Sequence, residues 1–163
     1  MNNSFSRKQQ AEKIVRQYAD MIFRIAFQNV KNKADAQDIL QEVSLTLLTK
    51  DAPLFDNDHI KPWLIRVTLN KCSNFHKLAH RKNEEPLDEN LAYDEPLDTE
   101  LLDEIMKLNK NYRNCLYLFY YEGYSIDEIA KILNKKPSTV GSWLYRARKK
   151  LKSMIMDGGS FYE

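Results

Sequence analysis

The 163-residue sequence predicts an all-α protein made of two small helical domains joined by an acidic flexible linker. Apolar residues recur at helical spacing along most of the chain, and no stretch alternates apolar with polar residues between turn signals. Only four glycines occur, so few positions weaken a helix. These observations leave little support for strands.

The distribution of charge divides the chain into two domains. Residues 1–82 carry 14 Lys and Arg against 8 Asp and Glu, residues 83–104 carry none against 10, and residues 105–163 carry 11 against 5. The net charge of +2 therefore conceals two basic segments on either side of an acidic one. Both basic segments suit a nucleic-acid partner.

The first domain is expected over residues 1–82, with helices near 7–30, 34–50 and 59–82. Each helix offers an apolar stripe, so the three helices can enclose one core. The stripes contain Ile14, Tyr18, Met21, Ile22, Ile25, Ile39, Leu40, Val43, Leu47, Ile60, Leu64, Val67 and Phe75.

The linker is expected over residues 83–98, which combine two prolines with seven carboxylates and cannot bury enough apolar surface to fold alone. The second domain is expected over residues 99–157, and residues 158–163 form a tail. The helices of the second domain are expected near 99–108, 113–122, 126–133 and 138–156.

Residues 124–152 contain two short amphipathic helices joined by a polar turn, which is the pattern of a DNA-reading helix-turn-helix. Pro137 suits the first turn of the second helix, although Ser138 could cap it instead. A dense row of cations follows along the second helix. The alternative to a DNA-reading helix-turn-helix is a helical domain whose last helix is basic and solvated. The apolar stripes are Ile126, Ile129, Ala130 and Leu133, then Val140, Leu144, Ala147 and Leu151; the cations are Arg146, Arg148, Lys149, Lys150 and Lys152.

Three stretches together resemble the extracytoplasmic-function (ECF, group IV) sigma factors of bacterial RNA polymerase. The first is DAQDILQEV, residues 35–43. The resemblance implies that Asp35, Asp38, Gln41 and Glu42 bind the clamp helices of the polymerase's largest subunit. Asp35, Asp38 and Glu42 share one helix face by their spacing, and a solvated acidic face is the alternative.

The second stretch is WLIRVTLN, residues 63–70, which is similar to the family segment beside the minus-ten promoter element. Cations, amides and rings follow it, a mixture that suits an unstacked single strand. Trp63 and Phe75 are alternatively core residues. The resemblance implies these minus-ten DNA-binding residues: Trp63, Asn70, Lys71, Asn74, Lys77, Arg81 and Lys82.

The third stretch is TVGSWLYRAR, residues 139–148, which is similar to the family's minus-thirty-five recognition helix. It departs from the family pattern at Gly141 and Trp143, where a cation is usual, so promoter preference cannot be transferred from relatives. The residues expected to face the groove are Ser138, Thr139, Gly141, Ser142, Tyr145, Arg146 and Lys149. Arg148 is assigned to phosphates or to the domain's own surface.

The resemblance implies a non-enzymatic sigma factor that binds core RNA polymerase, including the flap of its second subunit, and directs promoter binding, strand opening and transcription initiation. It also implies an anti-sigma factor partner. A free-standing dimeric regulator and a magnesium-dependent nucleic-acid enzyme are the rival interpretations. The rival enzyme would place Asp35, Asp38 and Glu42 around the metal, although one helix is poor geometry for such a centre.

Cys72 and Cys115 are far apart in sequence, which argues against a disulfide framework. Cys72, His76 and His80 recur every four residues, but a helix turns the third away from an ion held by the first two. We therefore expect no metal, no cofactor and no catalytic residue. The sequence contains no apolar segment long enough for membrane insertion, so we expect a bacterial cytoplasmic protein that an anti-sigma factor could hold at the membrane.

Overall fold

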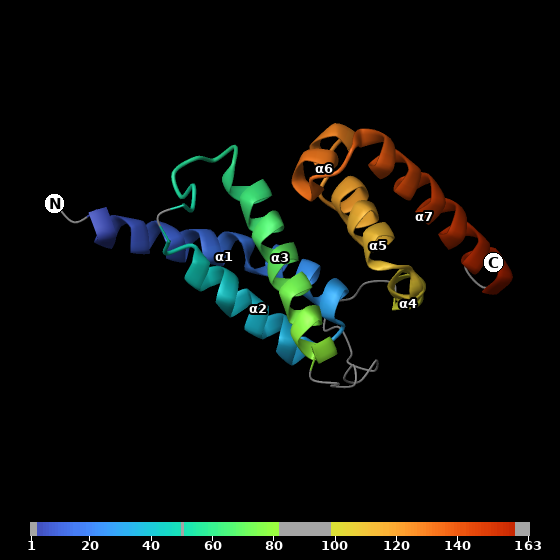
Figure 1. The fold of residues 1–163 in the computed structure, drawn as a ribbon, viewed down its shortest axis with the longest axis horizontal. Coiled ribbons are helices and arrows are strands. Elements are labelled where there is room, and N and C mark those ends of the chain that lie inside the picture. Colours follow the sequence, from blue (N-terminus) through green and yellow to red (C-terminus); the bar gives the residue numbers. More distant parts are fainter. Residues whose placement is uncertain (1–2, 50, 82–98, 159–163) are drawn as a thin grey trace. The chain divides into compact units, whose positions relative to one another are not determined.

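The computed structural model describes residues 3–49, 51–81 and 99–158 (Figure 1). All regular structure in these ranges is helical, which confirms the predicted all-α class. The predicted linker, 83–98, lies outside the described residues together with Lys82 and residues 159–163.

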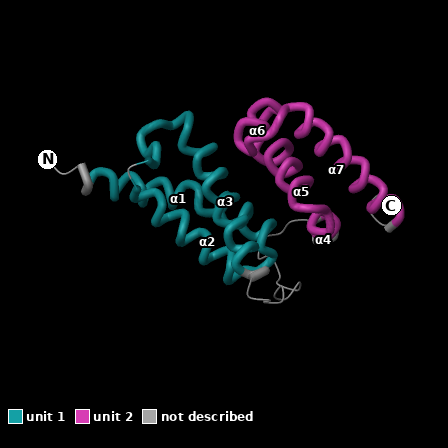
Figure 2. The backbone as a smooth tube through the Cα atoms, viewed as in Figure 1, with its two compact units in different colours: residues 1–91 teal, residues 92–163 magenta. Residues whose placement is uncertain are grey.

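The chain divides into two compact units, residues 1–91 and 92–163 (Figure 2). The division falls inside the segment that composition assigns to the linker. Each unit has its own buried apolar side chains, as expected for two small helical domains.

Unit 1 consists of α1 (Asn3–Val30), α2 (Lys33–Thr46) and α3 (Ile60–Arg81), and each helix packs against the other two. The predicted stripes meet at its centre, where Ile22, Val43 and Leu64 are completely buried. Tyr18, Leu40, Val67 and Phe75 are only half-buried, and they mark the edges of the core.

A tight turn joins α1 to α2 and makes the two helices neighbours. Lys31 has a left-handed φ of 57°, and its N–H donates to the Phe27 carbonyl at 2.8 Å. The Asn32 side chain then caps α2 by accepting from the Asp35 N–H at 2.9 Å. One residue thus ends α1 and the next begins α2.

Helix α2 ends at Thr46, earlier than the predicted residue 50. The chain leaves it through tight turns in which Leu48 and Thr49 donate to carbonyls three residues back. Side chains of α1 hold this exit, because Arg7 donates to the Thr49 carbonyl at 2.8 Å and Gln10 to the Leu54 carbonyl at 3.1 Å. Leu54 is buried, so packing against α1 overrides further helix growth.

The described part of unit 2, residues 99–158, contains four α-helices and one π-helical turn. In order these are α4 (Thr99–Lys107), α5 (Lys110–Leu116), η1 (Tyr117–Tyr121), α6 (Ile126–Leu133) and α7 (Pro137–Gly158). Helix α7 packs against α4, α5 and α6, and Leu108, Leu118, Ile129 and Leu144 are almost fully buried. Helix α7 includes Gly158, which the sequence assigns to the tail.

A buried arginine joins α4 to α5. The Arg113 guanidinium donates to the carbonyls of Leu108 and Met106, which lie at the end of α4. Burial lowers the pKa of Arg113 from its usual value of 12.5.

The sequence predicts a helix that begins at Arg113, but Asn109 caps α5 by accepting from the Tyr112 N–H at 3.0 Å. Arg113 is therefore inside the helix.

Candidate nucleic-acid interface

The entry to α6 is fixed by a capping box. The Ser125 hydroxyl accepts from the Glu128 N–H at 3.2 Å, and the Glu128 carboxylate accepts from the Ser125 N–H at 3.0 Å. These hydrogen bonds to Ser125 hold the pKa of Glu128 below its usual value of 4.5. Two otherwise free backbone donors are satisfied reciprocally, so α6 begins at a defined residue.

The turn between α6 and α7 depends on a left-handed asparagine. Asn134 has a φ of 54°, and the following Lys135 N–H donates to the Ala130 carbonyl at 2.9 Å. Asparagine tolerates this conformation better than most residues. Pro137 is the first residue of α7, where its missing N–H breaks no helical bond. This resolves the start of the helix in favour of Pro137.

Helix α7 has two opposite faces with the same residue spacing. Val140, Leu144 and Ala147 are completely buried and hold the helix against unit 2. The opposite side carries Ser138, Ser142, Tyr145 and Lys149 at i, i+4, i+7 and i+11, and all four are exposed. We call these four residues the outer row. Packing of the buried face therefore leaves the outer row available for a partner.

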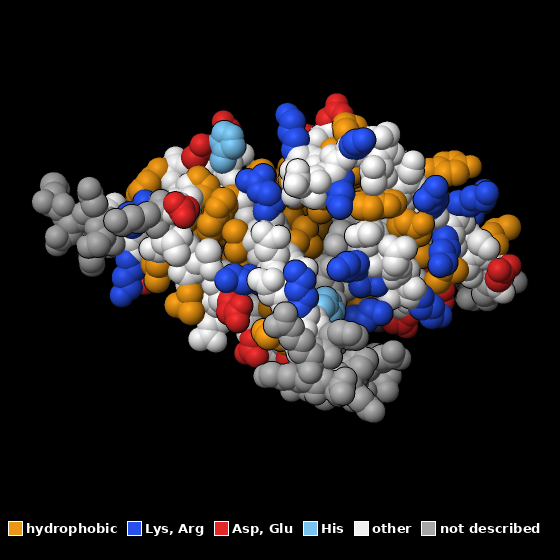
Figure 3. All heavy atoms as spheres, viewed as in Figure 1, with side chains coloured by type: hydrophobic (Ala, Val, Ile, Leu, Met, Phe, Trp, Pro, Cys, Tyr) orange, Lys and Arg blue, Asp and Glu red, His pale blue; other side chains and the backbone are white. Residues whose placement is uncertain are grey.

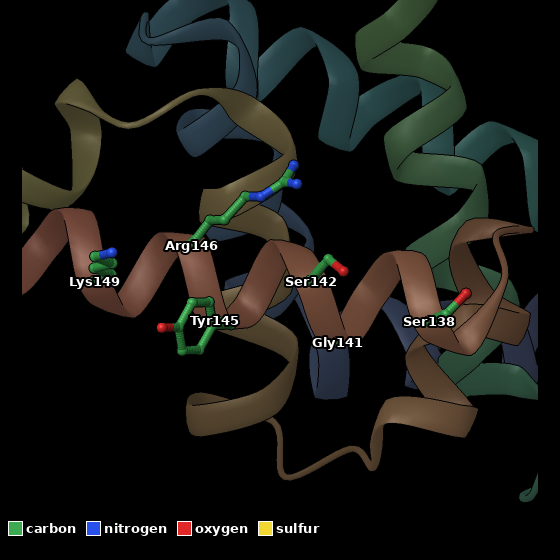
Figure 4. Close-up of a pocket in the computed structure, with 6 residues that line it drawn as sticks. All are labelled: Ser138, Gly141, Ser142, Tyr145, Arg146 and Lys149. Atoms are coloured by element: carbon green, nitrogen blue, oxygen red, sulfur yellow. The ribbon is translucent and has the colours of Figure 1, made fainter.

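The outer row borders a shallow hollow that Gly141 and Arg146 complete (Figure 4). In this view the Arg146 guanidinium extends back along the helix toward Ser142, and the Tyr145 ring projects from the opposite side of the helix. The hollow combines hydroxyls, a phenol ring and two cations. Hydroxyls and arginine can bind base edges in a major groove, while lysine suits phosphates.

Positive charge is concentrated on α7. Between Arg146 and Lys152 the helix carries five cations and no carboxylate. On the face drawn in Figure 3, Lys and Arg side chains recur along this helix. Such a row attracts the DNA backbone.

Arg148 points to a different partner from Arg146. Its guanidinium lies 5.7 Å from the centre of the Phe119 ring and 5.8 Å from that of Tyr120, and its Nε donates to the Leu144 carbonyl at 3.3 Å. A cation–π contact of this kind stabilises the conformation in which the Arg148 guanidinium lies over these rings. Of the two roles expected for Arg148, the geometry favours the surface of its own unit.

A second polar face lies on α3 in unit 1. Asn70, Asn74 and Lys77 follow one another at i, i+4 and i+7, and all three are exposed. Arg66, four residues before Asn70, is also exposed and extends the row. Arg66 is not among the residues predicted from the sequence, although its spacing from Asn70 is the signal that indicates it.

The remaining minus-ten candidates differ in burial. Trp63 and Lys71 are half-buried, so each has part of its side chain against the unit. Arg81 ends α3, and nothing is described of its side chain. The structure therefore places Asn70, Asn74 and Lys77 on one accessible face and leaves Trp63 at its border.

The side chains of Cys72 and His76 make contacts within unit 1. The Cys72 side chain is buried, and His76 Nε2 donates to the Asn29 carbonyl at 2.6 Å, near the end of α1. Within the described ranges, no group of three His, Cys, Asp or Glu side chains could hold a metal ion. Packing between α3 and α1 explains the placement of Cys72 and His76 better than zinc coordination does.

The acidic face of α2 is accessible along most of its length. Asp38, Gln41 and Glu42 are exposed, whereas Asp35 is half-buried in the first turn. Beyond them the structure exposes Leu45, with 62% of its surface accessible, and Leu48. The sequence analysis did not select these leucines, which fall outside the buried stripe of α2. Together these residues form a surface with both charged and apolar parts.

Neither thiol is placed for reaction with solvent. Cys72 and Cys115 are both buried, and burial raises the pKa of the Cys115 thiol from 9.0 to about 12. A thiol with so high a pKa is a poor nucleophile near neutral pH.

Comparison with known families assigns both units. Residues 14–82 match the family Sigma-70 region 2, and residues 98–151 match the family Sigma-70, region 4. Several similar proteins are ECF sigma factors by name. The chain therefore belongs to the sigma-70 family of RNA polymerase sigma factors, in its ECF class.

Individual relatives are distant in sequence, and the share of each relative that the chain spans varies. The chain is 29% identical to RNA polymerase sigma factor SigV of Bacillus subtilis, covering 82% of this chain and 83% of that protein. It is 26% identical to ECF sigma factor SigM of the same organism, covering 90% and 96%. Against ECF sigma factor BldN of Streptomyces coelicolor it is 26% identical and spans 58% of that protein.

Two solved structures share the fold. Sigma factor RpoE of Bartonella quintana, solved with the anti-sigma factor NepR, gives a TM-score of 0.72 at 18% identity, covering 89% of this chain and 96% of that one. CnrH, solved with the cytosolic domain of CnrY, gives 0.65 at 21% identity, covering 97% and 99%. Among the helices described in this chain, none has the length and apolar character needed to cross a bilayer.

Proposed function

We propose that the protein is a promoter-specificity subunit that binds core RNA polymerase and directs it to promoters with two separated elements. Unit 1 binds the minus-ten element and the polymerase, and unit 2 binds the minus-thirty-five element. Membership of the sigma-70 family carries the general role, and the placement of polar side chains on α2, α3 and α7 supports the division of labour.

The single observation that carries the upstream assignment is the pair of opposite faces on α7. The buried face fixes the helix to unit 2, and the outer row faces away from it with Arg146 at its border. A helix held in this way can enter a major groove without rearranging its own unit. We assign Ser138, Ser142, Tyr145, Arg146 and Lys149 to the minus-thirty-five duplex.

On α3 we assign the minus-ten contacts to Asn70, Asn74 and Lys77. An amide can hydrogen-bond an unpaired base edge, and a lysine nearby can neutralise a phosphate. Arg66 joins them as a phosphate contact, because it continues the same exposed row. Trp63 supports this face from its border.

On α2 we assign Asp38, Gln41 and Glu42 to the polymerase. Charged groups on such a surface steer association, while the exposed Leu45 supplies apolar area for the interface. The polymerase catalyses RNA synthesis, so this chain contributes promoter recognition and no catalytic group. Restraint by an anti-sigma protein remains an expectation from the family.

The decisive experiment combines the purified full-length chain with core polymerase and fragments of genomic DNA. Transcripts with defined starting points are expected only when both proteins are present. Filter binding with the chain alone provides the control. Tight, sequence-specific binding by the chain alone, with no transcripts in the mixture, would instead indicate a free-standing regulator.

A further inference from the structure

Gly141 is a glycine that the fold of unit 2 does not require. Its φ is not in the left-handed region, and a Cβ built at this position would meet nothing within 4 Å. A glycine inside a helix is less stable than alanine because it has more backbone freedom to lose. The reason for the glycine therefore lies outside the unit's own packing.

The position of Gly141 points to a ligand surface. It lies directly before Ser142 of the outer row, and it lines the hollow together with Tyr145. Tyr145 is one turn further on and 65% exposed, and it lines the same hollow as Gly141. Figure 4 shows the Tyr145 ring on the side of Gly141 that leads toward Lys149, and no side chain at Gly141 itself.

The chemistry of this surface is apolar. In the interior of a helix the backbone N–H and C=O groups bond to each other, so Gly141 presents mainly its Cα hydrogens. A polar base atom placed there would lose water without gaining a partner. The major groove offers one apolar group on a base edge, the C5-methyl group of thymine.

We propose that Gly141 and the Tyr145 ring form a seat for a thymine methyl group of the upstream promoter element, and that Gly141 determines specificity by admitting it. This inference rests on the proposed function. Ser138 and Ser142 flank the seat, and Arg146 and Lys149 lie beside it on the same helix. Any side chain at position 141 would fill the space that the methyl group occupies.

The test uses full-length protein with core polymerase and duplex fragments of a promoter that the wild type transcribes. Each thymine of the upstream element is replaced in turn by deoxyuridine, which removes only the methyl group. Affinity and its salt dependence are measured for wild type, Gly141→Ala and Ser153→Ala. The last variant also adds an alanine to an exposed position of α7, but away from the hollow.

We expect wild type and Ser153→Ala to lose roughly fourfold in affinity at one deoxyuridine position, the effect of one buried methyl group. Gly141→Ala should bind the unmodified promoter about tenfold more weakly and show no further loss at that position. Its salt slope should be unchanged, because no phosphate contact is removed. Its melting temperature should rise by roughly 4–8 °C.

The inference is overturned if no deoxyuridine position weakens wild-type binding, or if Gly141→Ala binds like wild type. A smaller salt slope for Gly141→Ala would indicate a phosphate at this position and would also overturn it. A lower melting temperature would show that unit 2 needs the glycine itself. Failure of the wild type to initiate at any promoter is a separate result, because it rejects the proposed function before any variant is tested.

Discussion

Arg146 and Arg148 provide a matched test of the upstream interface, because they are the same residue type two positions apart on one helix. Both are exposed, but only Arg148 rests on the rings of Phe119 and Tyr120. Arg146 makes no hydrogen bond or ion pair that the structure shows within the described residues, and it borders the hollow. Arg148→Ala should therefore lower mainly the stability of unit 2, and Arg146→Ala should lower mainly the affinity for DNA.

The expected magnitudes follow from these contacts. An exposed cation–π contact is worth about 0.5–1 kcal/mol, so Arg148→Ala should lower the melting temperature of unit 2 by roughly 2–8 °C. A base contact is worth about 1–3 kcal/mol, so Arg146→Ala should weaken binding of the upstream element by roughly 5- to 150-fold. If Arg146 binds a phosphate instead, the salt slope should fall by about 0.9.

The assay is fluorescence anisotropy of a labelled promoter duplex with reconstituted holoenzyme at several salt concentrations, alongside thermal melts of each variant. Arg148→Lys is the control for charge, since it keeps the cation but loses the planar stacking surface. Equal loss of DNA affinity in Arg146→Ala and Arg148→Ala would refute the assignment. So would a loss of stability in Arg146→Ala as large as that in Arg148→Ala.

Three further predictions concern the rest of the chain. Asn70→Ala should reduce strand opening, followed by 2-aminopurine fluorescence at the minus-ten element, more than duplex binding; equal reduction would remove Asn70 from the single-strand contacts. Leu144→Ala should destabilise unit 2 by about 2–5 kcal/mol in denaturant melts, because Leu144 is completely buried, and a loss under 1 kcal/mol would contradict that placement. Burial raises the pKa of Cys115 from 9.0 to about 12, so the unfolded thiol ionises first and stability should fall as pH rises above about 9. A Cys115→Ala variant should show a shallower decline over this range, and an identical decline would assign it to other groups.

The local pattern of the sequence was sufficient to place the helices approximately and to separate their inner from their outer faces. Val140, Leu144 and Ala147 are buried as their spacing predicts, while Ser138, Ser142 and Tyr145 are exposed. Amphipathic periodicity is a short-range property, because residues three and four apart share a helix face whatever the helix packs against. The same reasoning placed Asn70, Asn74 and Lys77 on one side of α3.

The limits of that reasoning appear wherever a side chain binds a residue far along the chain. His76 bonds to a carbonyl 47 residues earlier, and Arg7 reaches Thr49 across 42 residues at the end of α2. Arg148 has the same charge as Arg146 and is also exposed, yet it packs on aromatic rings of η1. The sequence alone determined the approximate positions of the helices and which side of each helix is polar, but not where α2 ends or where α5 begins. Only the tertiary structure decided which polar side chains its own packing occupies, because those partners become neighbours only when the helices pack together.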